Sequence, residues 1–237
     1  MTVRQYVKGI GLGSALVAVA MFVASPHGRA SGRSGDGNDD ESGMKSDRNG
    51  DESRIQRGFA IAPVPLNLEG KNPALVGLGS YIVNAVGDCD GCHSAGPQTE
   101  FAPGGNPYFG QPTKVNPKTY LGGGRNFGPL IPNTPDIISR NLTPDKTGRP
   151  EGGHTFPEFL QILRTGVDMD HLHPPCSATV TTNCLPRPFD GDLLQIMPWP
   201  IHHNMTNHDI RAFYEYLSAI PCIEGPPAPS PLHNDCQ

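Results

Sequence analysis

The chain has 237 residues, of which 18 are lysine or arginine and 23 are aspartate or glutamate, and its formal net charge is −5. This acidic balance argues against a nucleic-acid-binding protein and permits a basic protein partner. Apart from one stretch near the N-terminus, no segment is apolar enough to cross a membrane, so we expect membrane association to be at most peripheral.

The N-terminus is typical of an export signal. Arg4 and Lys8 precede an apolar stretch at 10–23, which has the length of a signal-peptide core and is short for a membrane span. Gly28 and Ala30 place small residues at the −3 and −1 positions of a cleavage site. We therefore predict a signal peptide over residues 1–30 and a periplasmic protein, with an uncleaved anchor as the alternative.

A linker is expected after the signal peptide. Residues 31–56 are rich in glycine, serine and charged side chains and poor in apolar ones. Such a segment buries too little apolar surface to offset its chain entropy, so we predict that it is disordered. The main domain is expected over residues 57–225, and a C-terminal tail over residues 226–237.

The first helix of the main domain is expected to begin at Pro73. Proline suits the first turn of a helix, and apolar residues follow it at helical spacing as far as Val86. Gly87 then favours the end of this helix.

The residues at 89–93 read Cys-Asp-Gly-Cys-His. This CxxCH pattern is the attachment signature of a c-type haem: Cys89 and Cys92 form thioethers with the porphyrin, and His93 binds the iron. A zinc site and a redox-active dithiol are the alternatives, but the chain has no second CxxC and no βαβ pattern around the motif. The motif therefore predicts one covalently bound haem c held by Cys89, Cys92 and His93.

The stretch at 94–150 contains many glycines and prolines and shows little periodicity. A long irregular stretch is unusual in a compact domain, and a bound porphyrin would give such loops an apolar core to fold around. Gly122-Gly123-Gly124 lacks the strand and helix of a nucleotide-binding loop and is interpreted as a turn.

Two further helices are expected beyond residue 150. Thr155 and Glu158 form a capping-box pattern ahead of one amphipathic stretch, and Thr206 and Asp209 form a weaker pattern ahead of another. We therefore predict an all-α fold of about three main helices around one haem, with long irregular loops.

Iron in a c-type centre usually has a second axial ligand, and a thioether raises its reduction potential. Met197 precedes Pro198-Trp199-Pro200, a stiff loop that can hold a sulfur atom in one place. We predict Met197 as this second iron ligand, with Met205 as the alternative. Bis-histidine ligation would instead use one of four histidines: His171, His173, His202 or His203. Three arginines are candidate partners of the haem propionates: Arg125, Arg140 and Arg164.

Four cysteines lie outside the motif. In an exported protein such thiols suggest disulfides, and four cysteines allow three pairings. We favour Cys176 with Cys184, which closes a short loop, and Cys222 with Cys236, which ties down the tail. Free thiols and a structural metal are the alternatives.

The order of these features resembles the class I cytochrome c fold. Over residues 60–222 the chain is similar to single-haem cytochromes related to the cytochrome subunits of periplasmic dehydrogenases. The segments that carry the resemblance are Gly79-Ser80-Tyr81, Asn141-Leu142-Thr143-Pro144-Asp145, Arg164-Thr165-Gly166 and Met197-Pro198-Trp199. The resemblance implies a cytochrome c-like fold, one-electron transfer, His93 and Met197 as axial ligands, and a contact between the first and last helices through Gly79 and Tyr216.

Three functions are compatible with these features. The first is a periplasmic electron carrier that is not itself an enzyme and exchanges electrons with a dehydrogenase, a terminal oxidase or another cytochrome. The alternative is a fixed electron-transfer subunit of a dehydrogenase complex, with the stretch at 94–150 as a docking surface. The third is catalysis at the haem, which needs a vacant or displaceable sixth position on the iron.

Overall fold

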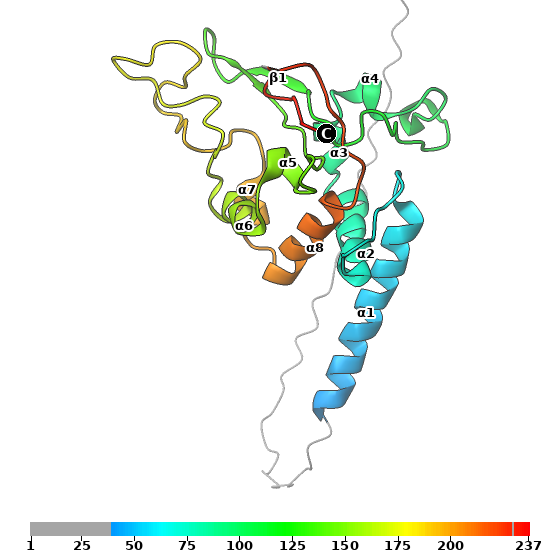
Figure 1. Cartoon of the computed structure of the whole chain (residues 1–237). Coiled ribbons are helices and arrows are strands. Elements are labelled where there is room, and N and C mark those ends of the chain that lie inside the picture. Colours follow the sequence, from blue (N-terminus) through cyan, green and yellow to red (C-terminus); the bar gives the residue numbers. More distant parts are fainter. Residues whose placement is uncertain (1–38, 229) are drawn as a thin grey trace, which may run out of the picture. The chain divides into compact units, whose positions relative to one another are not determined.

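The computed structural model describes residues 39–228 and 230–237 (Figure 1). The predicted signal peptide at 1–30 lies outside these residues. None of the described helices has the length and apolar character needed to cross a bilayer. The elements in chain order are α1 (Asp39–Ile61), α2 (Pro73–Tyr81), η1 (Ile82–Val86), α3 (Cys89–His93), α4 (Pro97–Glu100), η2 (Pro107–Phe109), β1 (Asn126–Pro129), β2 (Asp136–Ile138), α5 (Pro150–Gly153), α6 (Phe156–Thr165), α7 (Trp199–His202) and α8 (Asn207–Leu217).

The all-α prediction is wrong, because β1 and β2 form a two-stranded antiparallel sheet. Asn126 pairs with Ile138 and Pro129 with Asp136, and the Asn126 side-chain amide donates a hydrogen bond of 2.6 Å to the Asp136 carboxylate. The sheet lies inside the stretch at 94–150, which was expected to be irregular. Several of the remaining helices are only one turn long, so the fold mixes helices, a small sheet and long loops.

Helix α1 covers much of the segment that was predicted to be disordered. Residues 39–56 are helical, and the helix continues to Ile61. A Cβ atom on Gly58 would overlap the Gly77 carbonyl oxygen of α2, and the Ser80 hydroxyl donates a 2.7 Å hydrogen bond to the Gly58 carbonyl. The polar composition of this segment indicates disorder. The C-terminal end of α1 is nevertheless anchored on α2, and the helix extends from there towards the N-terminus despite the low apolar content of that part.

The predicted helix from Pro73 to Val86 is confirmed as α2 followed by the π-helical turn η1. The Asn72 side chain caps it by accepting the Ala74 N–H at 3.0 Å, and the Gly87 N–H closes it on the Ile82 carbonyl at 2.8 Å. The chain therefore turns directly from this helix into α3, which contains the CxxCH motif.

Both predicted capping patterns are confirmed. The Glu158 carboxylate accepts the Thr155 N–H at 2.7 Å at the start of α6, and the Thr206 hydroxyl accepts the Asp209 N–H at 3.0 Å at the start of α8. The caps begin two amphipathic helices whose buried faces belong to the main core, which also takes residues from α2. This core includes Val76, Phe159, Leu163, Ile210, Phe213 and Leu217.

Helices α2 and α8 lie side by side (Figure 1). Gly79 of α2 packs directly against the backbone of α8. A Cβ atom at this position would overlap the Ala212 carbonyl oxygen and would lie 2.6 Å from the Cβ of Tyr216. The expected contact of Gly79 with Tyr216 is therefore confirmed. It is extended by polar bonds, since the Tyr216 hydroxyl lies 2.8 Å from that of Tyr120 and accepts the Asn84 amide at 3.1 Å.

We predict that Gly79→Val lowers the free energy of unfolding by about 3 kcal/mol or more, because the added methyl groups overlap backbone atoms of α8. Urea unfolding of the secreted protein measures the effect. Gly50→Ala in α1 is the control, since a Cβ atom there meets nothing within 4 Å and alanine favours a helix by roughly 0.5–1 kcal/mol. Equal stability of Gly79→Val and the parent would contradict the tight crossing.

The predicted disulfide pairing is confirmed. Cys176 is bonded to Cys184 and Cys222 to Cys236, whereas Cys89 and Cys92 are free thiols. The first bond closes a loop in the long connection between α6 and α7, and the second closes the chain that follows α8.

Candidate functional site

The two motif cysteines differ in their surroundings. Cys92 is exposed and lines a cavity beside α3, whereas Cys89 is partly buried against the main core. Burial raises the pKa of the Cys89 thiol to about 12, and the neighbouring Asp88 adds to this shift. Both thiols lie on the single turn of α3, which places them on one short, ordered segment.

The cavity beside α3 brings together chain segments that are far apart in sequence. Its walls are mostly apolar and come from α3, β2, α6, α8 and the loop before α7. Examples of the residues that form them are His93, Ile137, Phe159, Leu163, Met197 and Phe213. A concave apolar site with a few polar groups is the usual form of a cofactor pocket.

His93 lines this cavity with one ring nitrogen already occupied. Its Nδ1 lies 2.7 Å from the Arg140 carbonyl oxygen, which can only accept, so Nδ1 carries the proton. The other nitrogen, Nε2, then keeps its lone pair. Burial lowers the pKa of His93, so the ring is neutral, and a neutral imidazole with a free nitrogen is the form that binds a metal.

The glycine triplet explains how the Arg140 backbone comes so close to His93. Gly123 has a positive φ of 73°, and a Cβ atom there would lie 2.5 Å from the Arg140 carbonyl carbon. The Gly123 N–H also donates a 2.7 Å hydrogen bond to the His93 carbonyl. The sequence predicts a turn at this triplet. In the structure Gly123 also lies between α3 and Arg140, the residue two positions after β2.

Met197 lines the same cavity and packs partly buried against the main core. Its backbone is held on both sides, because its N–H donates to the Gln195 carbonyl and its carbonyl accepts the Trp199 N–H, each at 2.8 Å. Among the described residues that form the walls, Met197 is the only methionine. Met205 packs against the core but is not part of the cavity wall.

Of the four candidate histidines, His173 lines the cavity. Its Nδ1 is buried and has no hydrogen-bond partner among the described residues, which is unusual for a polar atom inside a protein. The other three, His171, His202 and His203, are not part of the described cavity wall. The structure therefore leaves His173 as the alternative to Met197.

The three candidate arginines lie in different surroundings. Arg140 lines the cavity and is paired with Asp168 at 2.5 Å and with Asp170. Arg125 stacks 5.1 Å from the centre of the Phe127 ring, and Arg164 donates to the Asn207 side chain at 2.7 Å. Arg140 is thus the arginine of the three that contributes to the cavity wall.

Several buried carboxyl groups near the motif, among them Glu151 and Asp90, are not anticipated from the sequence. Glu151 lines the cavity, and burial raises its pKa to about 7 while Arg140 opposes that shift. Asp90, inside the motif, accepts the Leu121 N–H at 3.0 Å, and burial raises its pKa to about 7. Glu151 stands between Pro150 and two glycines, a context that indicates a turn and not a buried acid.

The groups around this cavity fit a c-type haem. The cavity wall combines the Cys92 thiol, a neutral imidazole with a free nitrogen, a thioether and largely apolar side chains, and the second thiol, Cys89, lies on the same turn of α3. The Nδ1 of His173 adds a polar atom that no group in the described part of the chain hydrogen-bonds. Thiols that form thioethers, with histidine and methionine as iron ligands, are the donor set of c-type cytochromes.

Comparison with known proteins finds one informative similarity. No protein-family model matches the chain, and no solved structure matches it. The gluconate 2-dehydrogenase cytochrome c subunit of Pantoea cypripedii is 29% identical over 148 residues, which cover 62% of this chain and 23% of that subunit. The chain thus resembles part of a longer cytochrome c subunit, and the similarity supports a relationship to cytochromes c.

Proposed function

We propose that this chain is a c-type cytochrome with one covalent haem and that it works as the electron-transfer subunit of a periplasmic dehydrogenase. The observation that carries the proposal is that Cys92 and His93 of the motif and Met197, which lies far from them in sequence, line one apolar cavity. The chain contains a single CxxCH motif, which supports a count of one haem.

Four residues would hold the haem. Cys89 and Cys92 would form its two thioether bonds, His93 would bind the iron through Nε2, and Met197 would supply a thioether sulfur as the second iron ligand. The bound iron would accept and release one electron at a time.

The surrounding residues would tune and protect this centre. The Arg140 carbonyl orients the His93 ring. Apolar side chains of the cavity wall, such as Phe159 and Leu163, would keep water away from the haem. Low polarity disfavours the additional charge of an oxidised centre, and a thioether ligand acts in the same direction. A comparatively high reduction potential follows.

The subunit role is preferred to a free carrier because of the similarity to a dehydrogenase cytochrome subunit. The two disulfides agree with a location outside the cytoplasm. With His93 and Met197 both bound to the iron, the chain itself would not carry out a substrate reaction, so the catalytic step would belong to a partner protein.

Expression in a host that matures c-type cytochromes tests the haem. We expect one haem per chain, retained after denaturation, as measured by mass spectrometry of the secreted protein. A colourless chain with an unmodified mass would overturn the proposal. Rapid binding of cyanide or carbon monoxide at neutral pH would instead favour chemistry at an open iron.

Purification of the tagged chain from its native host tests the subunit role. We expect a dehydrogenase catalytic subunit to co-purify and to reduce the haem when its substrate is added. A haem-loaded monomer that never co-purifies with a dehydrogenase but is reduced by one in solution would favour the free carrier.

A further inference from the structure

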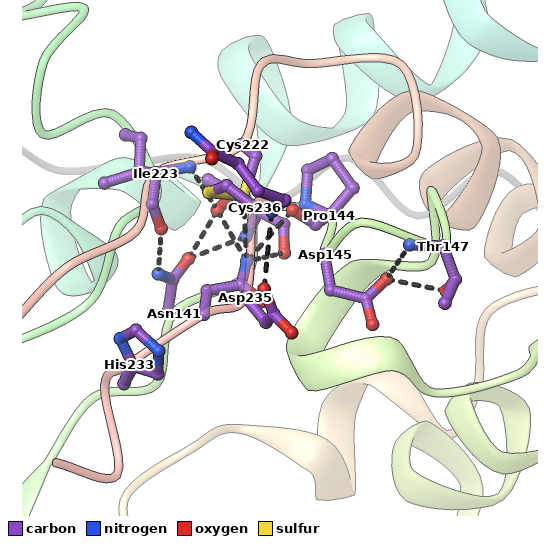
Figure 2. Close-up of a disulfide and its surroundings, with 12 residues drawn as sticks. Asn141, Pro144, Asp145, Thr147, Cys222, Ile223, His233, Asp235 and Cys236 are labelled. Carbon is purple, nitrogen blue, oxygen red and sulfur yellow. Dashed lines mark hydrogen bonds between the residues drawn. A yellow bond between two sulfur atoms is a disulfide. The ribbon is translucent and has the colours of Figure 1, made fainter. Parts of the chain in front are cut away.

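The chain after α8 folds back onto the segment that follows Arg140 (Figure 2). The Cys222–Cys236 disulfide closes this tail into a loop. Three buried polar side chains, Asn141, Thr143 and Asn234, join the tail to the segment. These three residues and the disulfide are here called the C-terminal clamp.

Ile223 lies at the start of the tail, and both its backbone N–H and its backbone carbonyl are hydrogen-bonded to side chains of the segment. The Asn141 amide donates to the Ile223 carbonyl at 2.7 Å, and the Thr143 hydroxyl accepts the Ile223 N–H at 3.0 Å. The same Thr143 hydroxyl donates to the Asn141 side-chain oxygen at 2.7 Å. The two side chains therefore act as one unit, because each positions the other.

Asn234 holds the end of the tail in a similar way. Its amide donates to the Thr143 and Pro144 carbonyls, each at 3.0 Å. Thr143 has no exposed surface, and Asn234 and Asn141 are 3% and 6% exposed. Loss of one partner would leave buried polar groups without hydrogen bonds, which destabilises the folded state. The clamp thus holds the backbone at 141–144 in one place.

The residue directly before this segment is Arg140, whose carbonyl accepts the hydrogen bond from His93 at 2.7 Å. Gly123 packs against the Arg140 carbonyl carbon on one side, and the clamp holds the next residue, Asn141, on the other. The Arg140 side chain is anchored separately by Asp168 and Asp170. The clamp is therefore one of the contacts that fix the position of the carbonyl itself.

We propose that the C-terminal clamp positions the Arg140 carbonyl against His93 and so tunes His93 as an iron ligand. This inference rests on the proposed haem site. A hydrogen bond from the far ring nitrogen makes an imidazole a stronger electron donor to a metal, and such outer partners influence metal sites strongly. A looser Arg140 carbonyl should make His93 a weaker donor and raise the reduction potential.

Thr143→Val tests the inference with nearly unchanged shape. Valine cannot accept the Ile223 N–H or donate to Asn141, so we expect the equilibrium for reduction to shift by about threefold, or about 28 mV at 59 mV per tenfold for one electron. We also expect faster hydrogen exchange of the His93 Nδ1–H, measured by NMR of the holoprotein. Thr143→Ser keeps the hydroxyl and should restore both values.

Asn234→Ala and Asp235→Ala form a second matched pair at neighbouring positions. Asn234 belongs to the clamp, whereas Asp235 is exposed and pairs with Lys146 at the surface. We expect only Asn234→Ala to raise the potential and to speed the exchange. This pair decides the question if Thr143→Val fails to fold.

The outcomes separate the two proposals. A parent chain without covalent haem removes the proposed function itself. Haem-loaded variants with the potential and the His93 exchange rate of the parent would overturn the clamp inference while leaving the proposed function intact. A lower melting temperature with both of those values unchanged would show that the clamp is only structural and would likewise overturn it.

Discussion

Replacing both Cys89 and Cys92 with alanine is expected to leave the secreted protein without covalently bound haem. Each thioether needs its own thiol, and the two thiols of α3 are the free cysteines among the described residues. Cys92→Ala alone is expected to lower the yield of covalent haem, because Cys89 can still form one bond. Haem staining and mass spectrometry of the denatured protein measure the loss.

The matched control removes the Cys176–Cys184 disulfide by changing both cysteines to serine. This pair forms a disulfide in the connection between α6 and α7 and takes no part in the motif. We expect the control to keep its covalent haem. Covalent haem in the Cys89→Ala, Cys92→Ala double variant would show that other side chains attach it and would remove the basis of the site.

Met197→Ala should keep the haem attached but lower the reduction potential and open the iron to external ligands. Loss of the thioether removes a ligand that favours the reduced ion, and a fall on the order of 0.1 V is expected within the roughly 0.8 V range that axial ligands control. A redox titration measures the potential. Loss of the near-infrared band of methionine-ligated oxidised haem and rapid cyanide binding are the spectroscopic checks.

Two control variants separate the candidate ligands. Met205→Ala removes a methionine that packs on the core but is not part of the cavity wall, and its potential should stay close to that of the parent. His173→Ala removes the histidine that does line the cavity. If Met197→Ala keeps the parental potential and His173→Ala changes it, His173 is the ligand.

Local features were predicted well because a few neighbouring residues determine them. The capping box at Thr155 and Glu158 acts over three residues. Proline suits the first turn of a helix because of its own fixed φ and missing N–H, whatever the tertiary surroundings of Pro73. The disulfide pairing followed from short separations of 8 and 14 residues.

The sheet and α1 could not be predicted in the same way. Strands β1 and β2 are short, and their pairing depends on two segments that meet across a turn and not on a pattern within either one. The polar composition of 39–56 indicated disorder, whereas the contact between Gly58 and Gly77 anchors this helix on α2. The sequence shows both glycines but does not show that their backbones lie against each other in the folded chain.

The amino-acid sequence by itself determined the cysteines and histidine of the motif, because their chemistry lies in five consecutive residues. Only the tertiary structure decided which distant groups meet them: Met197 and Glu151 in the cavity wall, and the Arg140 carbonyl at His93. The reason is that a carbonyl group has no signature in the sequence, and a side chain becomes part of a cavity wall only when remote segments fold together.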